Sequence, residues 1–155
     1  MRTIIGVVGP SEPTEKEYRF AETLGRLIAK EGWGLITGGK GGIMEGASKG
    51  AQEENGISIG ILPEKSKISA NPYVDIAIST GIGEARNFII ANSADALVAV
   101  GYSPGTLIEL AIASKNGKFI AAYEVPELPN LKFEKVSSPE EAIRKIKNFL
   151  RGKND

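Results

Sequence analysis

Apolar runs recur along the chain and predict a central β-sheet. They span residues 2–9, 33–37, 57–62, 74–78, 95–101 and 118–123, and residues 133–136 are a further candidate for a short edge strand. The run from Asp95 to Gly101 shows no polar alternation. Because both faces of such a strand must be covered, this pattern is typical of a central strand in a parallel sheet.

Helical patterns separate these runs. Thr14 and Glu17 have the spacing of a capping box, and the helix that follows ends at Gly32. Further helices are predicted over residues 43–54 and 84–93 and from Ser138 to near Leu150. One more helix is predicted to begin directly after a loop at residues 101–106. Strands that alternate with helices predict an α/β fold, namely a single Rossmann-like, doubly wound parallel sheet in three layers. We assign it to residues 1–150 and expect a frayed tail at 151–155.

Glycine-rich or small-residue loops follow several predicted strands, where the doubly wound fold binds its ligands. A strand that ends at a helix N-terminus points free N–H groups at one spot, which suits a phosphate. Our candidates for binding a phosphate or nucleotide are Gly9, Ser11, Gly38, Gly39, Lys40, Gly41, Gly42, Gly81, Tyr102, Ser103, Gly105 and Thr106.

The loop from Gly38 to Gly42 holds four glycines, which let a backbone wrap a phosphate or simply make a tight turn. It is not a P-loop, because Lys40 is followed by Gly41 rather than by a hydroxyl residue. The G-x-G-x-x-G dinucleotide pattern is also absent after the first strand.

Two charged residues bracket the 101–106 loop. Arg86 lies in the first turn of a predicted helix, where a cation opposes the helix dipole. It either binds an anion or forms a surface salt bridge with Glu84 or Glu45. Glu109 lies in an apolar helix and either contacts a ligand or faces solvent. Thr106 either contacts the ligand or caps its helix.

Composition narrows the chemistry. The 155 residues include no cysteine and no histidine, so thiolate nucleophiles and imidazole bases are excluded and no metal site is expected. The 19 basic and 19 acidic residues balance, and no basic run suggests a nucleic-acid partner. No apolar stretch reaches the roughly 18 residues of a membrane span. The lack of cysteine fits a reducing compartment, and we expect a cytoplasmic protein.

The motifs resemble those of the LONELY GUY-type phosphoribohydrolases, formerly called lysine decarboxylases. The segment from Gly38 to Met44 resembles the family motif G-G-x-x-G-L-M. Arg86 matches the family arginine, and the segment from Gly101 to Glu109 resembles P-G-G-x-G-T-x-x-E. The resemblance extends from the first predicted strand to the sixth.

This resemblance implies a nucleotide-binding Rossmann-like protein, usually a homodimer or homotetramer. Family enzymes cleave the N-glycosidic bond of a nucleoside 5′-monophosphate to free base and ribose 5-phosphate. Carried over, Arg86 and Glu109 would form the catalytic pair, with Arg86 on the phosphate end and Glu109 on the ribose. No cofactor would be required.

The third motif departs from the family pattern, since Gly101-Tyr102-Ser103 replaces its P-G-G. The family's second cation is also missing, because Asn87 follows Arg86. These changes resemble a divergent branch near the molybdenum-cofactor carrier proteins, which bind a phosphorylated pterin. The hydrolase is therefore our first hypothesis, and a non-catalytic carrier or sensor of a nucleotide or molybdenum cofactor is the alternative.

Overall fold

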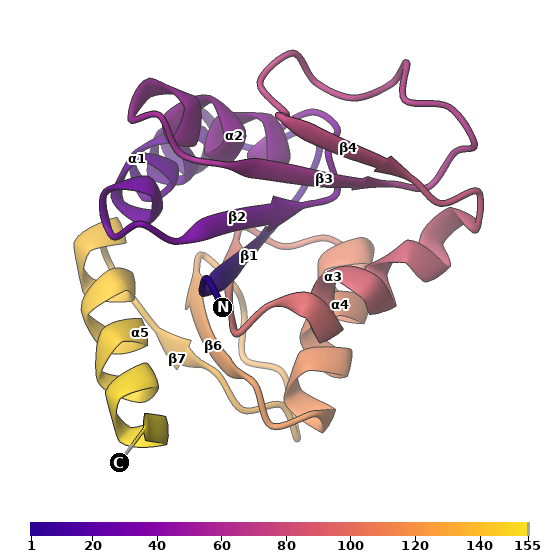
Figure 1. Ribbon diagram of the computed structural model, residues 1–155. Coiled ribbons are helices and arrows are strands. Elements are labelled where there is room, and N and C mark those ends of the chain that lie inside the picture. The colour runs from indigo at the N-terminus through magenta and orange to yellow at the C-terminus, as the bar shows by residue number, and fades with distance from the viewer. Residues whose placement is uncertain (155) are drawn as a thin grey trace.

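The computed structural model describes residues 1–154 and contains a seven-stranded sheet (Figure 1). The strands are β1 (Ile4–Val8), β2 (Gly34–Thr37), β3 (Ser58–Leu62), β4 (Ile76–Ser79), β5 (Ala96–Val100), β6 (Phe119–Tyr123) and β7 (Glu134–Lys135). Their order is β4-β3-β2-β1-β5-β6-β7, and every neighbouring pair is parallel. The predicted single α/β domain with a Rossmann-like parallel sheet is confirmed.

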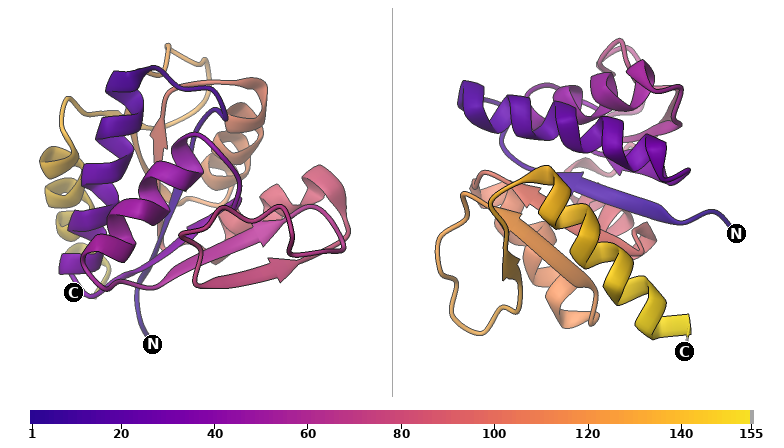
Figure 2. Two further views of the ribbon diagram at one scale, coloured as in Figure 1. Left: turned by 90° about the horizontal axis from the view of Figure 1, so that it is seen from above. Right: turned by 90° about the vertical axis from the view of Figure 1, so that its left-hand side faces the viewer.

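Helices cover both faces of the sheet (Figure 2). The helices are α1 (Glu15–Lys30), α2 (Ile43–Glu53), α3 (Arg86–Ser93), α4 (Pro104–Lys115) and α5 (Pro139–Asn154), with a 3-10 turn, η1 (Gly83–Ala85), before α3. Alternate residues of β1 enter two separate cores. Val7 packs with α1, α2 and α5, whereas Val8 packs with α3 and α4. The sheet is therefore the middle of three layers.

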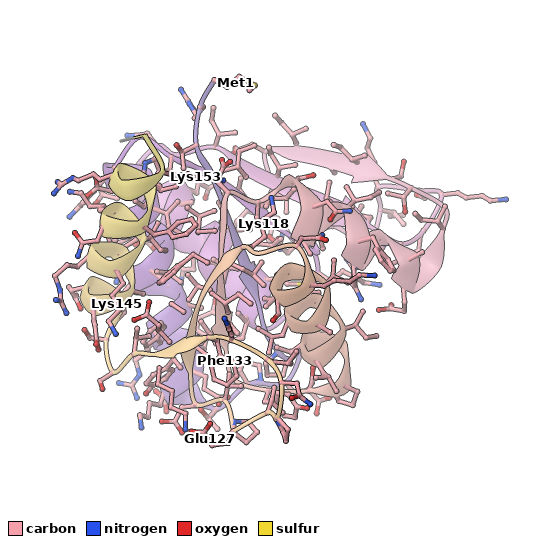
Figure 3. All side chains as sticks on the ribbon, turned by 90° about the horizontal axis from the view of Figure 1, so that it is seen from below. Met1, Lys118, Glu127, Phe133, Lys145 and Lys153 are labelled. Carbon is pink, nitrogen blue, oxygen red and sulfur yellow. The ribbon has the colours of Figure 1, made fainter. Side chains whose placement is uncertain are left out.

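Polar contacts anchor the outer helices to the strands (Figure 3). Lys145 on α5 pairs with Glu134 of β7 at 3.4 Å. Lys118, just before β6, donates hydrogen bonds to the carbonyls of Asn92 and Ala94 at the end of α3. These contacts add to the two apolar cores, which place α3 and α5 on opposite faces of the sheet.

The ends of some elements differ from the sequence-based boundaries. The helix α5 continues past Leu150 to Asn154, so the expected frayed tail is helical as far as it is described. Arg151 and Lys153 in its last turn stabilise a helix C-terminus, where the dipole is negative. Asp155 lies outside the described residues. Strand β4 begins two residues later than predicted, and the candidate edge strand at 133–136 is reduced to two residues.

The strand order reverses at β1. From β1 the chain adds β2, β3 and β4 on one side, and β5, β6 and β7 lie on the other. A crevice forms where such a sheet changes direction, outside the carboxyl ends of the central strands. The loops after β1, β2 and β5 all meet there, and they carry most of the candidate site residues.

Helices α1 and α2 touch backbone to backbone. A methyl group added at Gly25 would lie 2.0 Å from the carbonyl oxygen of Ala47, and one at Gly50 would lie 1.9 Å from that of Glu22. Both distances are far below van der Waals contact. The two glycines therefore allow the close approach that holds α2, and the loop before it, against α1.

We expect Gly50→Ala to lower the free energy of unfolding by about 2 kcal/mol or more, because the added methyl group forces the two helices apart. Chemical denaturation measures this change. The control is Gly152→Ala on α5, where a methyl group would meet no atom within 4 Å. That variant should keep or slightly raise the stability, since alanine favours a helix. An equal loss in both variants would contradict the tight helix contact.

Candidate functional site

A cavity of about 380 Å³ opens at the carboxyl edge of the sheet. It lies where the loops after β1, β2 and β5 meet the first turns of α3 and α4. The lining residues are Val7, Val8, Gly9, Ser11, Gly38, Lys40, Gly41, Met44, Glu84, Arg86, Asn87, Ser103, Gly105, Thr106 and Glu109. The volume suits a small molecule rather than a single ion.

Most of the predicted site residues meet at this cavity. Those that line it are Gly9, Ser11, Gly38, Lys40, Gly41, Arg86, Ser103, Gly105, Thr106 and Glu109. They come from segments separated by up to a hundred residues in the chain. The structure therefore brings these distant residues together at the carboxyl edge, and their role in binding stays a prediction.

The other candidates lie outside the cavity lining. Gly39 and Gly42 adopt positive φ angles of 75° and 70°, so they shape the turn. Gly81 lies near Lys65 in the loop after β4, and Tyr102 is partly exposed at the surface. Gly39 and Gly42 therefore serve the backbone conformation of the turn, and Gly81 and Tyr102 lie in loops away from the cavity wall.

Several wall residues were not predicted. Glu84 and Asn87 flank Arg86, and the Asn87 side-chain amide donates to Glu84 Oε2 at 3.3 Å. The sequence signal for them was their place in the first turn of the helix predicted over residues 84–93, although the structure places Glu84 in η1 and Asn87 in α3. Val7, Val8 and Met44 complete the wall with apolar surface, and nothing in their sequence pattern separates them from ordinary core positions.

Arg86 is a buried cation. Only 7% of the residue is exposed, and its Nη1 donates to the carbonyl oxygens of Gly38 and Ile61. Its Nε has no hydrogen-bond partner among the described residues. The surface salt bridge with Glu84 or Glu45 is therefore wrong as an explanation. The buried guanidinium leaves positive charge at the cavity wall without a carboxylate in contact with it.

Glu109 is buried as well, with 8% of the residue exposed, so the solvent-facing alternative is wrong. Burial raises its pKa to about 8, the positive charge of Arg86 opposes this shift, and the negative charge of Glu84 adds to it. At neutral pH the side chain is mostly protonated. It can then donate a hydrogen bond to a ligand and does not repel an anion.

The N-terminus of α4 completes the wall. Ser103 caps the helix by accepting from the Thr106 N–H at 3.3 Å, and the two hydroxyls lie 3.0 Å apart. The cap is thus Ser103, not Thr106, and Pro104 occupies the first helical position. The first-turn N–H groups and the helix dipole favour an anion here.

The described residues contain no group of three or more acidic or metal-binding side chains that could hold a metal ion. Within residues 1–154, none of the helices has the length and apolar character needed to cross a membrane. The site is thus a polar cavity with a buried cation, free backbone N–H groups and a neutral carboxyl group. Such a combination suits a phosphorylated small molecule.

The pKa of Glu109 predicts a pH effect on stability. Between pH 4.5 and about 8, the folded protein keeps a proton on Glu109 that the unfolded chain releases. The free energy of unfolding due to this group therefore falls as pH rises, by up to about 1.4 kcal/mol per pH unit. Glu109→Gln lacks the ionisation, so its stability relative to the unmodified protein should increase across this window. Denaturant melts over the pH range measure it, and parallel curves for the two proteins would contradict the raised pKa.

Known proteins with a similar sequence and fold match nearly the whole chain. An uncharacterized protein from Archaeoglobus fulgidus is 45% identical over 139 residues, which cover 90% of this chain and 91% of that one. The structure of a molybdenum cofactor binding protein from Rippkaea orientalis is 42% identical, with a TM-score of 0.93 over 97% of this chain and 98% of that chain.

The molybdenum cofactor carrier protein of Chlamydomonas reinhardtii is 38% identical, with a TM-score of 0.87 over 97% of this chain and 99% of that chain. Residues 2–149 match the SLOG cluster4 family. This match spans nearly the whole chain and includes every residue of the cavity wall. The chain therefore belongs to the SLOG cluster4 family.

Proposed function

We propose that this chain binds a phosphorylated pterin of the molybdenum-cofactor type in the cavity and carries it without consuming it. The observation that carries the proposal is the likeness, over nearly the whole chain, to structures named for binding or carrying that cofactor. This is the alternative hypothesis of the sequence analysis, and the comparisons support it better than the hydrolase.

The cavity wall fits the chemistry of such a ligand. The phosphate would lie against the N-terminus of α4 at Gly105 and Thr106, with the positive charge of Arg86 nearby. Glu84, Asn87 and the protonated Glu109 offer hydrogen bonds to a polar heterocycle.

A phosphoribohydrolase is the second candidate, because Arg86 and Glu109, the pair that the family resemblance makes catalytic, line the same cavity. Its mechanism would require Glu109 to be an ionised carboxylate that stabilises positive charge developing on the ribose. A pKa of about 8 leaves that group mostly uncharged at neutral pH. A protonated Glu109 suits a group that donates a hydrogen bond to a bound ligand, as the carrier would require.

We expect the purified protein to retain molybdenum cofactor released from a donor enzyme, at a ratio near one per chain and chemically unchanged. Gel filtration followed by fluorescence of the oxidised pterin measures the ratio. Thr106→Val removes a hydroxyl group from the cavity wall at constant shape, so retention should weaken about tenfold.

The control is Thr80→Val, which removes a hydroxyl that bonds the Leu62 carbonyl outside the cavity lining. That variant should retain the cofactor as the unmodified protein does. The same samples are incubated with a panel of nucleoside monophosphates and analysed by chromatography. Release of free base by the unmodified protein but not by Glu109→Gln would overturn the carrier in favour of the hydrolase.

An exposed apolar surface supports the homo-oligomer expected from the family resemblance. We call it the α3–β4 face, and it consists of Ile76, Ile78, Ile82, Phe88, Ile89, Leu107 and Ile108. Ile76 and Ile78 pair in register with Ile59 and Ile61. Since these two β3 residues belong to the core under α3 and α4, the β4 isoleucines lie on that same side of the sheet.

We infer that a second copy of this chain covers the α3–β4 face. The face carries no charged residue among its members, and a two-fold interface places the same patch on both subunits. It also adjoins the cavity. Phe88 directly follows the wall residue Asn87, and Ile108 directly precedes the wall residue Glu109. The partner would therefore lie beside the ligand site.

Ile108→Glu should shift the protein towards the monomer, since it buries a charge in the inferred interface. Light scattering after size-exclusion chromatography measures the mass. Ile57→Glu is the matched control, because Ile57 is 37% exposed and Ile108 is 42% exposed, but Ile57 lies outside the α3–β4 face. A protein that is monomeric before any substitution, or one that both variants dissociate equally, would contradict this interface.

A further inference from the structure

The connection between β3 and β4 holds one deeply buried polar residue, Asn71. Only 8% of Asn71 is exposed, although the sequence predicted a surface loop over residues 63–73. Its backbone N–H donates to the Gly39 carbonyl at 2.8 Å, and its side-chain Nδ2 donates to the Lys40 carbonyl at 2.8 Å. Its Oδ1 accepts from the Tyr73 N–H at 3.0 Å. Asn71 thus donates hydrogen bonds to two successive peptide carbonyls of the glycine-rich loop.

Those contacts determine how the peptide groups of the loop are oriented. The chain has no cis peptide bond, so the N–H of each peptide points away from its carbonyl oxygen. With the Gly39 and Lys40 carbonyls held by Asn71, the N–H groups of Lys40 and Gly41 point the opposite way. Neither N–H has an acceptor among the described residues.

The lining of the cavity indicates that these N–H groups point towards it. Lys40 and Gly41 line it, whereas Asn71 and Gly39 do not. The same wall contains Arg86, which is more than nine-tenths buried and has an unpartnered Nε. This buried cation is a separate indication that the wall binds an anion. The Lys40 ammonium is paired with Glu64 at 2.5 Å, so recognition at this loop falls to the backbone.

We propose that Asn71 is a positioning residue, which orients the Lys40 and Gly41 N–H groups as a nest for the phosphate group of the ligand. Successive backbone N–H groups that converge in this way form anion-binding concavities in other folds. Asn71 would act only through the loop and would not touch the ligand. The proposal rests on the proposed function only in that the ligand carries a phosphate.

The test uses inorganic phosphate and the amide resonances of the protein in nitrogen-15 NMR spectra. In the unmodified protein, the Lys40 and Gly41 amide signals should shift as phosphate is added. Asn71→Asp keeps the acceptor for the Tyr73 N–H but cannot donate to the Lys40 carbonyl. We expect this variant to bind phosphate about tenfold more weakly and to lose the Gly41 shift, whereas the Lys40 shift should persist because the Asn71 backbone N–H still holds the Gly39 carbonyl. The Gly105 amide on α4 should still respond.

Asn116→Asp is the matched control, because it also exchanges a hydrogen-bonded amide for a carboxyl group. Asn116 caps the far end of α4, about 18 Å along the helix from the cavity. This variant should bind phosphate as the unmodified protein does. Lys40 and Gly41 signals that stay fixed while Gly105 shifts would overturn the proposal, as would unchanged behaviour of Asn71→Asp.

These outcomes are separate from those of the cofactor experiment. If the protein binds phosphate through Lys40 and Gly41 but retains no pterin, the proposed function fails and the role of Asn71 stands. If it retains the pterin while the two amide signals ignore phosphate, the role of Asn71 fails and the proposed function stands.

Discussion

The guanidinium of Arg86 is the interaction on which the site depends. It is buried and bonded to two carbonyl oxygens, at the ends of β2 and β3, so it joins both strands to the start of α3. A buried charge is costly unless other groups compensate it. Here carbonyl dipoles supply part of the compensation, and the buried Nε has no hydrogen-bond partner within residues 1–154. The neighbouring residue Gly38 has no room for a side chain, since a methyl group there would lie 2.5 Å from Nη1.

The protonation of Glu109 follows from the same burial. Arg86 favours the charged carboxylate, but desolvation outweighs it and the pKa rises to about 8. The charge of Arg86 at the cavity wall is thus not neutralised by an ion pair with Glu109. An ion pair between the two residues would neutralise that wall and leave less attraction for an anionic ligand. The electrostatics of the site therefore favour an anionic ligand.

Sequence reasoning can find a site residue when its type is unusual for its position in a predicted helix or strand. Arg86 was notable as a cation at a helix start, and Glu109 as an acid in an apolar helix, and both line the cavity. Gly42 lies outside the cavity lining, and a glycine that binds a phosphate and one that packs a turn look alike in sequence. A methyl group at Gly42 would lie 2.4 Å from the Pro10 carbonyl, so its role is packing.

Asn71 could not be found in this way. It lies in an aperiodic loop, and its side-chain contact with Lys40 spans 31 residues. Contacts of that kind depend on how two loops meet, which no local pattern encodes. The exposed isoleucines of β4 could not be predicted either. An apolar strand is normally interpreted as buried, and the sequence does not show that no helix covers this one.

The pairing of β1 with β5 has a consequence for synthesis on the ribosome. Ile5 lies opposite Ala96, and the Ile4 N–H bonds to the Asp95 carboxylate, so the two central strands are joined across about ninety residues of chain. Contacts of such long sequence separation form late, because the intervening loop must close first. While β5 and α4 are still inside the ribosome, the nascent chain has its glycine-rich loop but lacks the part of the cavity wall that α4 supplies. The pocket can form only when roughly the first three quarters of the protein have left the ribosome.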